Sequence, residues 1–178
     1  AFVMHILSWL DTSGTAAIVC FPGIMYRGGA EKKIRKYLID NNFVEAIIQL
    51  PDNLFYGTTI ATCILVLKKS KKDNKILFSD ASKEFVKVTN SNKLTDQNIE
   101  NVITHLNDRK DSQYLTKLVT IDDVAEQDYN LSVSTYVEQK DNREKVDIVK
   151  LNKDLEEIVK KENELRKAID KIIADLER

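Results

Sequence analysis

The sequence predicts an α/β fold, and three observations lead to this prediction. Continuous apolar runs at residues 15–21, 43–50 and 59–67 are typical of strands buried on both faces of a parallel sheet. Residues 30–41 separate the first two runs and space their apolar side chains as a helix does. The chain ends in a long segment whose apolar residues recur in steps of four and three. We therefore expect a strand–helix–strand unit in a sheet, followed by a long helix.

The first half of the chain contains two predicted helices. The one at residues 30–41 carries Ile34, Tyr37 and Leu38 on its inner face. An earlier helical stripe ends near residues 11–14 and consists of Phe2, Val3, Ile6, Leu7 and Leu10. The connection between residues 50 and 59 holds no helix, so the third apolar run is expected to return antiparallel.

Shorter elements are predicted in the second half. Residues 75–79 and 115–119 have the apolar content of short strands. Thr95 and Thr120 are cap residues at the starts of helical segments, the first of which extends to about residue 106. The Asp-Tyr-Asn sequence at residues 128–130 predicts a turn.

Composition excludes some functions and favours none. The 178 residues have a formal net charge of −1, so no overall basic field attracts nucleic acid. Cys20 and Cys63 lie inside apolar runs, which indicates core thiols of a reducing compartment rather than a disulfide framework. No apolar run reaches transmembrane length. We expect a soluble, cytoplasmic protein.

Two adjacent aromatic residues, Phe55 and Tyr56, lie in the loop between the second and third apolar runs. Pro51 ends the strand before them, and Gly57 with two threonines follows. An exposed aromatic pair at the end of a buried strand suits a site that stacks a flat ligand. The alternative is that one ring fills the end of the core while the other is an ordinary surface residue.

Residues 49–67 and 27–35 resemble the N6-adenine DNA methyltransferases, specifically the modification subunits of type I restriction-modification systems. The resemblance extends over residues 1–137 and includes Asp128-Tyr129-Asn130-Leu131, for which it implies no chemistry. It implies an enzyme that transfers a methyl group from S-adenosylmethionine to N6 of adenine in duplex DNA.

The same resemblance implies the C-terminal half of a Rossmann-like methyltransferase sheet. Residues 15–21 would be its fifth strand, and residues 43–50 and 59–67 the antiparallel pair that ends it. The cofactor loop and the catalytic Asn-Pro-Pro-Phe motif are missing, because the prolines of this chain are Pro22 and Pro51. We expect a fragment that starts inside a helix, is inactive alone and binds no cofactor.

Three regions are expected along the chain. Residues 1–80 would be the C-terminal half of the methyltransferase α/β domain. Residues 81–137 would form a mixed extension, and residues 138–178 a polar linker and a long coiled-coil-like helix.

The resemblance assigns roles to three residues near the predicted strand ends. These enzymes flip the target adenine out of the duplex and hold it between aromatic faces. Phe55 corresponds to one of those faces, and Tyr56 is the weaker candidate. Arg27, before Gly28 and Gly29, is a candidate contact for a DNA phosphate, although glycines there also suit a simple loop before a helix. No Cys/His cluster predicts a metal site.

The C-terminal segment predicts a helix with a coiled-coil seam that has one polar member. Such a helix would be about 38 Å long, which is too long to be buried on this domain. Val159 and Ile173 widen the stripe and favour a multi-helix bundle. The seam consists of Leu151, Leu155, Ile158, Glu162, Leu165, Ile169, Ile172 and Leu176.

The resemblance implies that this helix docks on the specificity subunit, in a complex that also holds the restriction subunit and duplex DNA. Self-association of the fragment through the same face is a further expectation, and no membrane partner is expected. The sequence is also compatible with two other functions. One is a non-catalytic α/β interaction module that assembles through its C-terminal helix. The other, a small nucleotide-binding domain, lacks a phosphate motif.

Overall fold

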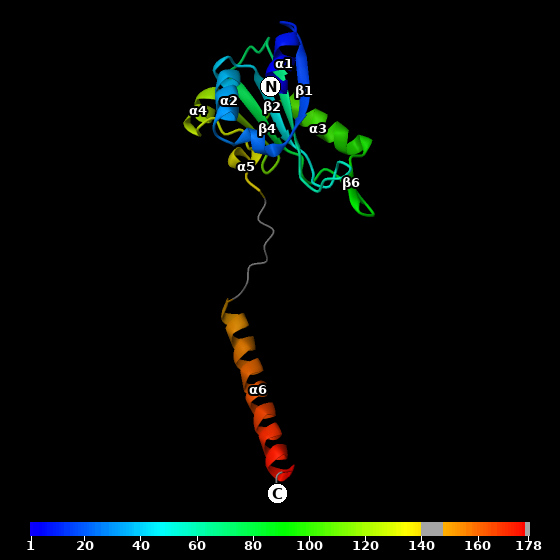
Figure 1. Ribbon diagram of the computed structural model, residues 1–178, viewed down its shortest axis with the longest axis vertical. Helices are drawn as coiled ribbons and strands as arrows, with labels where there is room; N and C mark the ends of the chain where they lie inside the picture. The colour runs from blue at the N-terminus through cyan, green and yellow to red at the C-terminus, as the bar shows by residue number, and fades with distance from the viewer. Residues whose placement is uncertain (140–147, 177–178) are drawn as a thin grey trace. The chain divides into compact units, whose positions relative to one another are not determined.

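The computed structural model describes residues 1–139 and 148–176. The chain divides into two compact units, Ala1–Lys140 and Asp141–Arg178. The first is an α/β unit, and the described part of the second is the helix α6 (Ile148–Leu176) (Figure 1). No described helix has the length and apolar character needed to cross a bilayer.

A mixed sheet of five strands forms the centre of the first unit. Its order is β1-β3-β2-β4-β7. β1, β2 and β4 run in one direction, and β3 and β7 run in the other. The strands are β1 (Thr15–Cys20), β2 (Val44–Gln49), β3 (Cys63–Lys68), β4 (Lys75–Asp80) and β7 (Thr116–Thr120).

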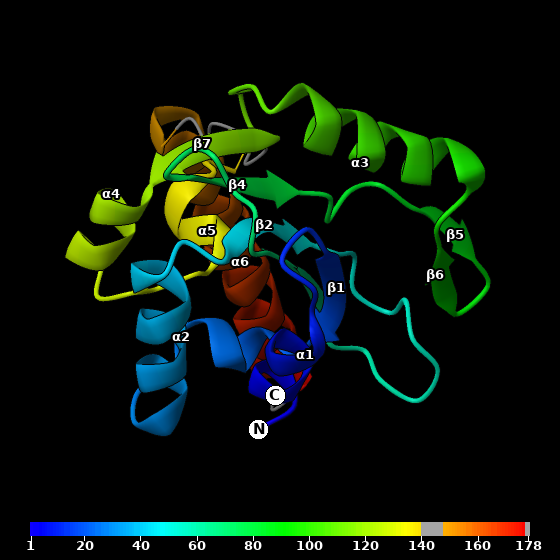
Figure 2. The ribbon, with the colours of Figure 1, turned by 90° about the horizontal axis from the view of Figure 1, so that it is seen from above.

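Helices cover both faces of this sheet (Figure 2). Four of them contribute side chains to the larger core: α1 (Phe2–Trp9), α2 (Ala30–Asp40), α4 (Ile121–Glu126) and α5 (Val133–Tyr136). On the other face, Val102 and Leu106 of α3 (Asp96–Asp108) pack against a smaller cluster that includes Ile48 and Leu50.

Strand β3, which lies between β1 and β2, shows why a continuous apolar run is needed. Cys63, Leu65 and Leu67 belong to the larger core, whereas Ile64 and Val66 pack against the smaller one. Successive side chains of a strand point to opposite faces, so a strand covered on both sides must be apolar at every position. The predicted antiparallel return of this run is confirmed.

Local sequence signals also place two helix starts correctly. Thr95 and Thr120 each accept a hydrogen bond from the backbone three residues later, and the Asn98 and Asp123 side chains bond back to them. These capping boxes satisfy N–H groups that the first helical turn leaves without partners.

Several sequence-based expectations are wrong in detail. β1 is not buried on both faces, because it lies at the sheet edge with one neighbour, and Val19 is 54% exposed. The third run begins its strand at Cys63, so residues 59–62 belong to the preceding loop. On α2, Tyr37 is exposed, and the buried residues are Arg35, Leu38 and Ile39.

The expected end of the sheet is also wrong. β2 and β3 do pair, but β4 adds a parallel strand beyond β2, and β7 adds an antiparallel one beyond β4. Residues 81–95, for which no elements were predicted, contain a small hairpin of β5 (Val86–Val88) and β6 (Ser91–Lys93).

The helix of the second unit presents its apolar side chains to solvent. Within α6, all seven apolar seam residues and the flanking Val159 and Ile173 are exposed. Glu162, the polar seam residue, pairs with Arg166 one turn later at 2.8 Å. The predicted helix is confirmed, while its coiled-coil pairing stays a prediction. The polar linker predicted from residue 138 lies mostly outside the described residues.

Candidate functional site

The direction of the strands brings three loops to one edge of the sheet. β1, β2 and β4 are parallel, and β3 begins where they end. The segments that follow the three parallel strands, residues 21–29, 50–62 and 81–95, therefore all leave from the carboxyl edge. Ligands of open α/β sheets bind at this edge, and the predicted residues Arg27, Phe55 and Tyr56 all lie on these loops.

The middle loop, residues 50–62, is closed at its base by hydrogen bonds. The backbone N–H of Leu50 donates to the carbonyl of Thr62 at 2.9 Å. The Gln49 amide donates to the carbonyls of Leu50 and Thr62 at 3.2 and 3.0 Å. The carbonyl of Gln49 itself accepts from Ala81 N–H at 2.9 Å, which joins this base to the segment after β4.

A tight turn forms the tip of this loop. The backbone N–H of Thr58 donates to the carbonyl of Phe55 at 3.4 Å, and Gly57 occupies the third position with φ of +76°. Turns with positive φ at this position favour glycine. A Cβ atom at Gly57 would meet nothing within 4 Å, so glycine is needed here for its backbone conformation and not for space.

Both aromatic side chains of the turn are accessible. Phe55 is 42% exposed and Tyr56 is fully exposed. Leu54 instead packs against the smaller core. The side chain next to this turn that contacts the core is therefore a leucine and not one of the two aromatic rings. The loop therefore presents two rings at the carboxyl edge, next to a partly buried leucine.

A second set of contacts supports this loop from the β5–β6 hairpin. The side-chain amide of Asn92 donates to the carbonyl and the carboxylate of Asp52, both at 2.9 Å. The backbone N–H of Asn92 donates to the carbonyl of Asn53, also at 2.9 Å. Asn92 is 9% exposed. Sequence reasoning missed both Gln49 and Asn92, because nothing in the sequence links residues 49 and 92 to one loop.

Arg27 lies on the loop that follows β1. Its guanidinium is 5.7 Å from the centre of the Phe21 ring, a cation–π geometry. A Cβ atom at Gly23 would lie only 2.8 Å from Arg27 Nε, so Gly23 leaves the room for this side chain. Arg27 remains exposed and makes no ion pair with any described residue.

The Asp-Tyr-Asn-Leu stretch at residues 128–131 stabilises this first loop. The buried Arg35 donates to the carbonyls of Tyr129 and Ile24 at 2.8 and 2.7 Å. Burial lowers the pKa of Arg35 from its usual value. Leu131 N–H donates to the carbonyl of Met25 at 2.8 Å. The stretch thus has a structural role in holding the segment that leads to Arg27.

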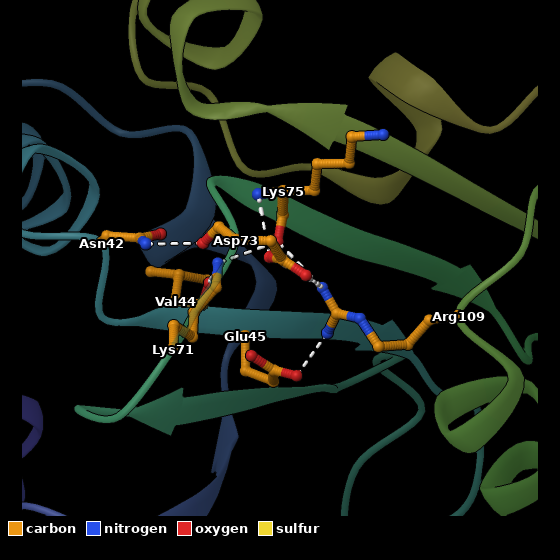
Figure 3. A network of polar contacts seen from close by, with 7 residues as sticks. All are labelled: Asn42, Val44, Glu45, Lys71, Asp73, Lys75 and Arg109. Atoms are coloured by element: carbon orange, nitrogen blue, oxygen red, sulfur yellow. Dashed lines mark hydrogen bonds and ion pairs between the residues drawn. The ribbon is translucent and has the colours of Figure 1, made fainter.

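A polar network occupies the opposite edge, at the starts of β2 and β4 (Figure 3). Lys71 donates to the carbonyls of Val44 and Lys75 at 2.7 and 2.8 Å, and burial lowers its pKa to about 8. Arg109 pairs with Glu45 and Asp73. These cations already bind protein oxygens, so the network stabilises turns and is a poor ligand site.

The thiols and carboxylates do not form a reactive or metal-binding centre. The Cys63 thiol lies 3.5 Å from the carbonyl of Cys20, and burial raises its pKa to about 12. The thiolate is the nucleophilic form, so Cys63 is inert at neutral pH. Across residues 1–139 and 148–176, no group of three metal-ligating side chains converges.

S-Adenosylmethionine is a poor match for the apolar cavity of the described residues. Its amino-acid group and ribose hydroxyls need polar partners. The apolar cavity of about 270 Å³ between α1 and α2 is lined by residues such as Phe2, Ile18 and Leu65. Of its charged residues, Glu31 and Arg35, the second already donates to two carbonyls.

Comparison with known proteins decides the family. Residues 1–145 match the family model of the N-6 DNA methylases. The chain belongs to the N-6 DNA methylase family. It is 49% identical over 177 residues to the type I restriction enzyme MpnII methylase subunit of Mycoplasma pneumoniae, covering 99% of this chain and 33% of that protein. It is 37% identical over 166 residues to the MjaVII methylase subunit of Methanocaldococcus jannaschii, covering 90% and 28%. The chain thus spans about a third of the length of these relatives.

Two solved structures show the same fold over most of this chain. The methyltransferase subunit of a type I restriction-modification system from Streptococcus thermophilus superposes with a TM-score of 0.75 and 37% identity, over 77% of this chain and 30% of that one. The type I restriction enzyme EcoKI M protein superposes with a TM-score of 0.65 over 80% of this chain and 38% of its own. At 16% identity, the second likeness concerns the fold alone.

Proposed function

We propose that this chain is the part of a type I DNA methylase subunit that holds the target adenine and docks the subunit into its complex. One observation carries the first half of the proposal. The exposed Phe55 and Tyr56 lie on a carboxyl-edge loop that Gln49 and Asn92 stabilise from two sides. A ring on a stabilised loop can stack a base without a further ordering cost.

In this proposal Phe55 stacks on the flipped adenine, and Tyr56 extends the same aromatic surface. Arg27, on the neighbouring loop, neutralises a DNA phosphate. S-Adenosylmethionine supplies the methyl group that is transferred to N6 of adenine. The cofactor site and the catalytic Asn-Pro-Pro-Phe motif belong to parts of the subunit outside these 178 residues.

Substitution of Phe55 in the complete methylase complex tests the proposal. Phe55→Ala should weaken capture of the flipped base, since stacking contributes roughly 1–3 kcal/mol per base. The fluorescence rise of 2-aminopurine at the target position should fall, and methylation should slow by roughly 5- to 150-fold. Phe55→Trp should retain both signals.

Tyr37→Ala provides the matched control, because Tyr37 is a similarly exposed aromatic residue on α2. It should leave flipping and methylation unchanged. If Phe55→Ala shows wild-type fluorescence and wild-type methylation, Phe55 does not stack on the target base.

The second half of the proposal concerns α6. Its bare apolar stripe is suited to helices of the specificity subunit, in a complex with the restriction subunit and duplex DNA. The same stripe also favours the alternative function, a non-catalytic module that only assembles. If α6 variants abolish assembly while Phe55 and Tyr56 variants leave methylation intact, the alternative is preferred.

A further inference from the structure

The β5–β6 hairpin lies beside the aromatic loop. In both ribbon views it projects from the same end of the sheet as residues 50–62 (Figures 1 and 2). The contacts of Asn92 with Asp52 and Asn53 join the two segments directly. The hairpin therefore has a fixed place next to Phe55 and Tyr56.

The two faces of the hairpin differ in their surroundings. Lys87 lies directly opposite Asn92 in the strand register, and opposed residues of an antiparallel pair share one face. The Asn92 side chain contacts Asp52, so this face is the one turned toward the aromatic loop. Lys93 lies opposite Val86 and belongs to the other face.

Lys87 carries a positive charge that the described residues leave uncompensated. It is exposed, and no carboxylate of residues 1–139 or 148–176 forms an ion pair with it. Lys32, Lys36 and Lys117, in contrast, each pair with an aspartate.

A flipped nucleotide remains covalently joined to the phosphates on both sides of it. Any surface that holds the base therefore lies close to backbone phosphates of the same strand. Phosphates attract lysine without regard to sequence.

We propose that the Lys87 face of the β5–β6 hairpin binds a DNA backbone phosphate next to the target adenine. This inference rests on the proposed function, because it takes the aromatic loop as the place of the flipped base. Asn92 is a positioning residue in this arrangement, since it keeps the phosphate-binding face and the stacking ring at a fixed separation.

The salt dependence of DNA binding by the complete methylase complex tests this proposal. Fluorescence anisotropy titrations between about 50 and 200 mM salt give the slope of log K against log salt. Loss of one phosphate contact should reduce the magnitude of that slope by about one. Lys87→Ala should show this change, Lys87→Arg should not, and Lys93→Ala should match the wild type. An unchanged slope for Lys87→Ala, or an equal change for Lys93→Ala, would overturn the proposal.

Phe55→Ala in the same titration separates this inference from the proposed function. It should lower 2-aminopurine fluorescence while leaving the salt slope unchanged. A lost fluorescence signal in Phe55→Ala with an unchanged slope in Lys87→Ala refutes the phosphate contact alone. A reduced slope in Lys87→Ala with normal flipping in Phe55→Ala supports the contact and refutes the role of Phe55.

Discussion

Single residues at the carboxyl edge differ in how far sequence can predict them. Gly57 and the aromatic pair could be predicted because a turn is a local feature, encoded within four residues. Gln49 and Asn92 could not, because their hydrogen bonds join segments up to 40 residues apart. Only the folded chain brings Asp52 and Asn92 together, and it is this contact that stabilises the loop.

The half-buried ammonium of Lys71 should give stability a measurable pH dependence. Burial lowers its pKa from 10.5 to about 8 in the folded state. Between these values the unfolded chain binds a proton that the folded chain does not, so the Lys71 contribution to the free energy of unfolding rises with pH. Denaturant titrations at pH 8 and pH 10 should show this rise in the wild type and lose it in Lys71→Met.

Lys72→Met is the matched control, because Lys72 lies in the same turn and is exposed. It should keep the pH dependence of the wild type. Buried Cys63, whose pKa is raised to about 12, contributes an opposite trend above pH 9, and the difference between variants removes it. Identical slopes for the two variants would show that Lys71 is well solvated.

The positions of helices and strands were predicted better than the burial of their side chains. The helix predicted from Thr95 to about residue 106 has Ile99, Val102 and Ile103 on its apolar stripe. In α3, Val102 is buried, yet Ile99 and Ile103 are 43% and 42% exposed. Tyr37 on α2 was likewise predicted on the inner face of its helix, but its side chain is exposed. The period of a sequence identifies an apolar face, but the neighbours in the fold decide how much of it is covered.

The apolar stripe of α6 is expected to bind the specificity subunit. Leu165→Asp with Ile169→Asp should abolish binding to the specificity subunit, because two carboxylates on the apolar stripe would be buried at the interface without partners. Co-purification of the complete subunits measures the loss, and circular dichroism should show an intact α/β unit.

Asn163→Asp with Ala174→Asp adds the same charge to exposed positions away from the seam and should preserve binding. Retained binding by the Leu165 and Ile169 variant would mean that α6 is not the docking element.

At the scale of the whole molecule, the sequence predicted the α/β class and the long helix but not the order of the strands. β4 and β7 were recognised as strands, whereas their places beyond β2 depend on pairing between residues 75–80 and 116–120. Such pairing leaves no local signal. The family resemblance did not predict these positions either, since it placed the end of the sheet at the β2–β3 pair.

The 178-residue chain alone should not bind S-adenosylmethionine at micromolar concentrations. Its carboxyl edge offers aromatic and basic groups, and the cavity between α1 and α2 is mainly apolar. Isothermal titration calorimetry measures the binding, with the complete methylase subunit as the positive control. Saturable micromolar binding to this chain would contradict the assignment of the cofactor site to other parts of the subunit.

The position of β3 between β1 and β2 has a consequence for folding during synthesis. The two earlier strands are parallel but share no ladder, because β3 lies between them and pairs with both. A chain that emerges from the ribosome N-terminus first cannot join β1 to β2 until Lys68 has been made. Until then both strands have unpaired backbone edges, and such edges can pair with the wrong strand or with another chain. The interval ends only when β3, with its preceding loop already turned, inserts between β1 and β2.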